Sequence, residues 1–274
     1  MSTPNTSSSG LPPIFLDAEG GSDSLPPNPM QGVPPHVSSL LARLHAESLE
    51  QEKAFEGKTA ADFPGHTFAQ VMADKFIALE EDKCHFLYQV ARAIGAKTIV
   101  EVGTSYGVST IYLALAAAAN VKDTGGKGRV IGTEHEPGKA ARARQHWDEC
   151  GESVRDVIEL REGDLRERLK EDTGTVDLVL LDSTSPFCER SLTAFARTRF
   201  TKLNVVWTPM ALPALKLLQP NLRPGAVIIA DNTAAAARDY KELFEHTRSP
   251  GSPFITSTLP FKGGLDFTVY LPRT

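Results

Sequence analysis

Residues 98–119 constrain the fold of this chain most strongly, because they indicate a strand, a glycine loop and a helix in immediate succession. Residues 99–102 are mostly β-branched, as in a buried strand. The chain then passes through Gly103 and Gly107, which permit tight turns and close approach to a ligand. An Ala- and Leu-rich run long enough for a helix follows, and its first N–H groups suit an anionic group. This unit predicts a doubly wound α/β fold.

Strand and helix patterns continue to alternate toward the C-terminus. Apolar runs predict strands at 129–134, 157–162, 176–182 and 226–231, helices at 137–150, 164–172, 212–219 and 234–248, and a terminal hairpin of strands at 254–259 and 265–271. The order of these units predicts five parallel strands followed by a hairpin.

The N-terminal part has a different composition. Residues 1–35 are rich in Ser, Pro and Gly, which predicts a disordered tail. An amphipathic helix is expected at 36–55, and a longer helical pattern runs through 68–94, with Gly95 as its stop. We therefore divide the chain into a tail, an N-terminal helical cap at 36–95 and a main domain at 96–274.

Composition excludes several classes of function. The chain has 274 residues, of which 41% are hydrophobic and 23% charged, as in ordinary globular proteins. Its net charge of −5 gives no footprint for nucleic acid, and no apolar run approaches the ~20 residues of a membrane span. The N-terminus has no signal-peptide pattern, and the three cysteines show no disulfide or zinc spacing. We expect a cytoplasmic protein.

Polar side chains follow the predicted strands. Ligands of open α/β sheets bind beyond the carboxyl ends of the strands. The polar residues found there are Glu101, Glu134, Asp164, Asp182, Asp231 and Asn232. Each one alone could merely cap the next helix. Six at successive strand ends favour a shared ligand site.

The glycine loop also suggests a family. Its pattern is E-x-G-x-x-x-G, from Glu101 to Gly107, and it lacks the third glycine of the dinucleotide fingerprint. Together with the strand-end residues, this resembles class I S-adenosylmethionine-dependent methyltransferases, and among them the catechol O-methyltransferase-like group. The resemblance covers about residues 74–272. It implies a Rossmann-like, seven-stranded, mostly parallel sheet, whose N-terminal helices cover the cofactor.

The resemblance also implies roles for individual residues. Glu101 and the glycine loop would frame the methionine part of S-adenosylmethionine, and Ser109 would bind its carboxylate. Glu134 would accept hydrogen bonds from the ribose hydroxyls, with His135 beside the adenine. The full set of implied cofactor-binding residues is Glu101, Gly103, Thr104, Ser105, Gly107, Ser109, Glu134, His135, Gly163, Asp164 and Asp182.

A divalent cation is implied as well. In the catechol O-methyltransferase-like group, the residues matching Asp182, Asp231 and Asn232 bind Mg²⁺, an oxygen-ligand set suited to a hard cation. Asp182 is then the catalytic residue of the site. The alternative is that Asp231 and Asn232 only cap the next helix. The lysine that usually follows the fourth-strand Asp is absent before Lys202, so the general base is unassigned.

Residues 183–206 interrupt the expected pattern. The segment that normally follows the fourth-strand Asp resumes at Trp207. The intervening residues carry four cationic side chains and one acidic one, in a chain that is acidic as a whole. They form either a functional lid at the mouth of the site or a retained intron, whose length preserves the reading frame.

These observations favour a metal-assisted O-methyltransferase of a small-molecule hydroxyl. Two alternatives stay open: an N-methyltransferase, and a cofactor-binding pseudoenzyme, which the absent lysine and the interrupted loop would fit. An NAD-dependent dehydrogenase is disfavoured by the missing third glycine. Family habit implies a homodimer.

Overall fold

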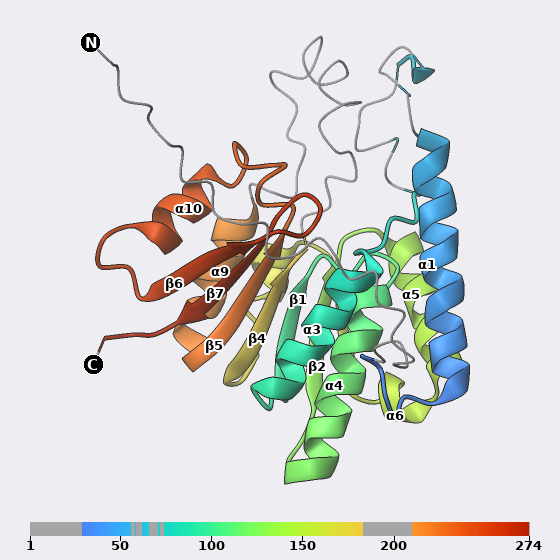
Figure 1. Cartoon of the computed structure of the whole chain (residues 1–274), viewed down its shortest axis with the longest axis horizontal. Helices are drawn as coiled ribbons and strands as arrows, with labels where there is room; N and C mark the ends of the chain where they lie inside the picture. The colour runs from blue at the N-terminus through green and yellow to red at the C-terminus, as the bar shows by residue number, and fades with distance from the viewer. Residues whose placement is uncertain are drawn as a thin grey trace, which may run out of the picture.

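A computed structural model describes residues 29–55, 58, 62–65, 71, 74–182 and 210–273. Its centre is a seven-stranded sheet of order β3-β2-β1-β4-β5-β7-β6 (Figure 1). β7 runs antiparallel to β5 and β6, and the other pairs are parallel. The predicted doubly wound, mostly parallel sheet is confirmed. The strands are β1 (Thr98–Val102), β2 (Arg129–Glu134), β3 (Ile158–Glu162), β4 (Val176–Leu181), β5 (Leu222–Asp231), β6 (Phe254–Leu259) and β7 (Leu265–Tyr270).

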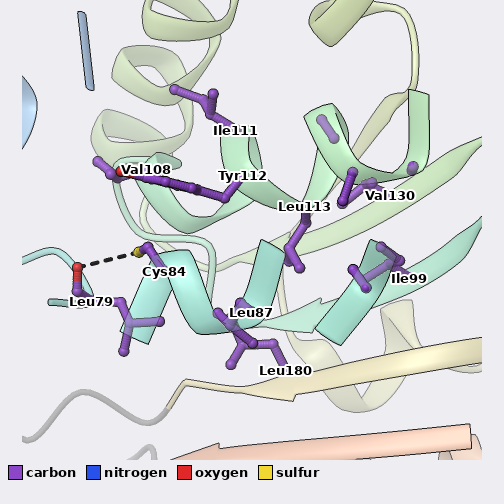
Figure 2. Packing of buried hydrophobic residues seen from close by; sticks show 14 of the residues in the cluster. Leu79, Cys84, Leu87, Ile99, Val108, Ile111, Tyr112, Leu113, Val130 and Leu180 are labelled. Carbon is purple, nitrogen blue, oxygen red and sulfur yellow. Dashed lines mark hydrogen bonds between the residues drawn. The ribbon is translucent and has the colours of Figure 1, made fainter. Parts of the chain in front are cut away.

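Helices cover both faces of the sheet (Figure 1). One face carries α1 (Pro35–Phe55), α3 (Glu81–Ala93), α4 (Val108–Thr124), α5 (Pro137–Cys150) and α6 (Glu152–Arg155). The other carries α7 (Leu165–Arg168), α9 (Ala211–Leu218) with the short η3 (Gln219–Asn221), and α10 (Lys241–Arg248). The helices of the first face and the sheet enclose a hydrophobic cluster, the first core. Figure 2 shows it, and there Leu87 of α3, Leu113 of α4 and Leu180 of β4 are fully buried. Burying each of these leucines contributes about 1.5–3 kcal/mol.

Three predicted helices are shorter than expected. The segment from Lys75 to Glu80, called the extended segment below, is neither helix nor strand, whereas the apolar spacing predicted helix through it. Its N–H groups bond to side chains of α1 instead: Phe76 donates to Gln51 Oε1 at 3.0 Å and Ala78 donates to Ser48 Oγ at 2.8 Å. Neither partner is detectable from local periodicity.

The helix predicted at 234–248 begins only at Lys241. The preceding turn residues donate their N–H groups to the β6–β7 turn: Ala234 and Ala235 both bond to the carbonyl oxygen of Gly263 at 2.9 Å. Likewise, α7 covers only part of the helix predicted at 164–172. In each case a tertiary hydrogen bond or a short cap replaces helical pairing.

Residues 1–28 and the proposed insertion at 183–206 lie outside the described residues. Residues 29–34 form a turn into α1, and Met30 and Val33 pack against the first core. No helix in the described part of the chain is long and apolar enough to span a membrane.

Candidate active site

The strand register aligns the residues that end four neighbouring strands. The last paired positions of β2, β1, β4 and β5 lie side by side, so the next residues form one row. This row is Glu134, Gly103, Asp182 and Asp231 in spatial order. It lies at the carboxyl edge of the sheet, where open α/β folds bind ligands. Residues spread over 128 positions of sequence, from Gly103 to Asp231, thus meet, as the strand pattern predicted.

The glycine loop fits tightly against its neighbours. Gly103 has φ +94°, and a Cβ there would lie 2.5 Å from the backbone oxygen of Asp182. At Gly107, with φ +75°, a Cβ would lie 2.6 Å from Nε1 of Trp147. That indole N–H donates to the Gly107 carbonyl at 3.0 Å. Both glycines are therefore required by backbone conformation and by space.

Glu101 and Ser109 bond to each other beneath the loop. The Ser109 hydroxyl donates to Glu101 Oε1 at 2.6 Å, and the hydroxyls of Thr104 and Thr110 donate to Oε2. Glu101 is fully buried, and burial raises its pKa to about 7 against the lowering effect of these hydroxyls. These bonds tie β1 to the start of α4 and so support the loop. Direct contact of Glu101 or Ser109 with a cofactor stays a prediction.

Glu134 is held by three backbone N–H groups. Its Oε2 accepts from Ser105 at 2.6 Å, and its Oε1 accepts from His135 and Glu136, both at 2.8 Å. Ser105 adopts φ +50°, an uncommon conformation for a residue other than glycine. The glycine loop is thereby anchored to the end of β2.

Gly163 and Asp164 follow β3 and lie next to this edge. Gly163 donates its N–H to the Glu134 carbonyl at 2.8 Å. Asp164 caps α7, accepting from the Arg166 N–H at 2.9 Å, and it also pairs with the Arg166 guanidinium. That pairing lowers the Asp164 pKa to about 2. The capping interpretation thus holds for Asp164, and an adenine contact stays a prediction.

A small cleft opens between the glycine loop and the extended segment. About 200 Å³ of space free of protein atoms lies along it, open solvent included. Its lining is Phe76, Ile77, Ala78, Leu79, Thr104, Ser105, Tyr106, Gly107, Val108, Ser109 and Asp182. Four of the predicted cofactor residues besides Asp182 thus line one cleft. The extended segment supplies its apolar wall, which the sequence interpretation had assigned to a helix.

Asp182 and Asp231 form the acidic end of the site. Asp182 Oδ1 is buried without a hydrogen-bond partner among the described residues. Burial, and next the charge of Asp231, raise the Asp182 pKa well above its usual value. Burial also raises the Asp231 pKa, to about 6, against the opposing effect of Lys83. An unpaired buried carboxylate oxygen beside a second carboxylate is a donor set that a hard cation would satisfy.

Asn232 turns its amide nitrogen, and not its oxygen, toward the Asp231 carboxylate. Its Nδ2 donates to Asp231 Oδ2 at 2.7 Å, and its Oδ1 lies where a Cβ on Gly263 would be only 2.3 Å away. The described residues contain no cluster of three or more His, Cys, Asp or Glu side chains that could hold a metal. The fit to a cation therefore depends on the two carboxylates, with Asn232 beside them.

Lys83 is the site residue that the sequence interpretation missed. It was assigned to a solvated face or a local hydrogen bond, but its side chain is fully buried. Its Nζ lies 2.6 Å from Asp231 Oδ1 and 2.8 Å from Glu80 Oε2. Burial lowers the Lys83 pKa, but the two carboxylates outweigh this and raise it overall, so the group is an ammonium. The available signal was its phase: Lys83 precedes Leu87 and Val90 on the apolar face of α3.

Comparisons with known proteins agree with this geometry. Residues 100–233 match the family model of a methyltransferase domain. A catechol O-methyltransferase from Niastella koreensis is 29% identical over 178 residues, which cover 64% of this chain and 65% of that protein. A catechol O-methyltransferase from Mycobacterium tuberculosis is 35% identical over 108 residues, 39% of this chain and 45% of that protein. The matches therefore span less than two thirds of these relatives.

Solved structures share the fold. The O-methyltransferase TomG from Streptomyces achromogenes, involved in tomaymycin synthesis and solved in complex with SAM, has a TM-score of 0.58 at 20% identity, covering 85% of this chain and 90% of its own. An O-methyltransferase from Bacillus cereus in complex with SAH has a TM-score of 0.55 at 22% identity, with the same coverage. Residues 100–233 of this chain thus match a methyltransferase domain, the seven-stranded sheet has the class I methyltransferase fold, and two catechol O-methyltransferases are similar to parts of the chain.

Proposed function

We propose that this chain transfers a methyl group from S-adenosylmethionine to a hydroxyl oxygen of a small molecule. The row of Glu134, Gly103, Asp182 and Asp231 along the carboxyl edge carries the proposal, because it provides a cofactor end and an acidic acceptor end on adjacent strands. The catechol O-methyltransferase relatives and the SAM- and SAH-bound neighbours support it.

The cofactor end would receive the ligand through backbone and carboxylate groups. A carboxylate offers about four acceptor positions, and Glu134 uses three for N–H groups, so one remains for a ribose hydroxyl. Gly103 and Gly107 let the loop pack closely against Asp182 and Trp147, and this packing holds the loop where the methionine part would lie. His135, Gly163 and Asp164 would flank the adenine.

The acceptor end would hold a divalent cation such as Mg²⁺ between Asp182, Asp231 and Asn232. When bound, such a cation supplies a positive charge that lowers the pKa of an acceptor hydroxyl. The chain itself keeps water from this end through Ile77 and Leu79, which are buried in the cleft wall. It also holds the two carboxylates in place at the ends of β4 and β5. No general base is assigned.

Calorimetric titration of the full chain with S-adenosylmethionine tests the cofactor end. We expect saturable binding in the micromolar range, and its absence in a folded protein would refute the proposal. Transfer of labelled methyl from S-adenosylmethionine to a panel of catechols, phenols and amines then tests the reaction. We expect the label to appear on catechols or phenols, and we expect this transfer to stop when EDTA removes the divalent cation. Labelled amines alone, or binding without any turnover, would replace O-methylation by the corresponding alternative.

A further inference from the structure

We propose that Lys83 is a positioning residue of the acceptor end: it holds one oxygen of Asp231 so that the other faces Asn232 and the cation site. The inference rests on the proposed function for the role of that site. Lys83 lies on α3 and Asp231 at the end of β5, 148 residues further along the chain. The lysine therefore reaches the site only through tertiary packing.

The two oxygens of the Asp231 carboxylate have different side-chain partners. Oδ1 accepts from Lys83 Nζ at 2.6 Å, and Oδ2 accepts from Asn232 Nδ2 at 2.7 Å. The Asp231 side chain is 3% exposed, so water cannot replace either partner freely. The carboxylate is thus fixed at both ends, with Oδ2 turned toward the other predicted ligand of this strand end.

The Lys83 side chain is itself held in place by its surroundings. Its neighbour Cys84 is fully buried, and the Cys84 thiol lies 3.5 Å from the Leu79 carbonyl oxygen (Figure 2). The Lys83 ammonium also bonds to Glu80, one turn before it, at 2.8 Å. The first turn of α3 and the extended segment therefore hold the ammonium at a defined place. A mobile surface lysine would lose much more conformational entropy on making such a contact.

Charge alone would give the opposite expectation. A positive charge next to a cation ligand repels the cation, so removing it would strengthen metal binding. Outer-shell partners, in contrast, orient ligands, and their loss typically weakens metal binding about 10–100-fold. We infer that orientation dominates, because the Asp231 carboxylate has only one other side-chain partner among the described residues, the neutral amide of Asn232. The sign of the change separates the two explanations.

The test measures Mn²⁺ binding to the full chain by electron paramagnetic resonance, without substrate. We expect saturable binding to the wild type, and binding weakened about 10–100-fold in K83M. K83R keeps the charge but moves the donor atoms, so we expect an affinity between the two. K122M, which changes an exposed lysine of α4, is the matched control and should bind as the wild type does.

Equal or tighter Mn²⁺ binding in K83M would overturn the proposal, as would wild-type affinity in K83R or the absence of saturable binding in the wild type. If K83M does not fold, K83R decides alone. Calorimetry with S-adenosylmethionine on the same variants separates the two proposals. Lys83 does not line the cleft, so cofactor affinity should stay unchanged. A wild type that binds Mn²⁺ as expected but never S-adenosylmethionine would refute the function and leave the role of Lys83 standing.

Discussion

Replacing Gly103 with alanine should damage both the fold and the candidate site, for two separable reasons. Gly103 has φ +94°, a region that residues with a Cβ rarely adopt. Its added Cβ would also lie 2.5 Å from the backbone oxygen of Asp182, and that oxygen belongs to the strand end that bonds to Val102 through the Asp182 N–H at 3.1 Å. The neighbouring strand end must therefore move.

The two costs can be added. A residue with a Cβ at positive φ costs about 1–2 kcal/mol, and forcing atoms into a packed region costs about 1–3 kcal/mol more. G103A should therefore lose about 2–5 kcal/mol from a total stability of order 5–15 kcal/mol. Gly95 provides a control, because it has φ +64° and nothing within 4 Å of an added Cβ. G95A should lose only the first amount, about 1–2 kcal/mol.

Urea unfolding followed by circular dichroism gives the free energy of unfolding of each variant. Calorimetry with S-adenosylmethionine then shows whether the displaced strand end also weakens binding in G103A and not in G95A. Equal destabilisation of the two variants would show that the approach of Gly103 to Asp182 carries no cost. It would refute the argument that this glycine is required for close packing of the two strand ends.

Three further predictions concern the same edge of the sheet. Burial raises the Glu101 pKa from 4.5 to about 7, so the folded protein binds the proton more tightly than the unfolded chain does. The free energy of unfolding should therefore fall by about 3 kcal/mol as pH rises through this window. In urea unfolding E101Q should lack this part of the pH dependence, and an unchanged slope would contradict the assignment. E134Q should weaken S-adenosylmethionine binding about tenfold in calorimetry, whereas E136Q, which keeps its backbone contact, should not. W147F removes the indole donor to Gly107 and should cost about 1–3 kcal/mol in urea unfolding, and a cost near zero would show that the bond does not matter.

Local sequence patterns determined most of the sheet. The strands at 129–134 and 254–259 and the helix at 137–150 have the predicted bounds, because continuous apolar runs between turn residues define buried elements without outside help. The row of strand-end residues also follows from sequence, since parallel strands bring their carboxyl ends to one edge. Gly103 and Gly107 predicted the loop for a local reason, because glycine adopts backbone conformations that other residues rarely adopt.

Tertiary structure alone decided the contacts that complete the site. Periodicity cannot show that Phe76 and Ala78 bond to side chains of α1, and these bonds turned a predicted helix into the extended wall of the cleft. Nor can it show that Lys83 pairs with Asp231, because the two groups meet only when α3 packs on the sheet that contains β5. A lysine on an apolar helix face indicated burial but not its partner. The sequence by itself placed the candidate ligand site at the carboxyl ends of the strands, and the packing of distant segments decided which side chains hold its acidic end in place.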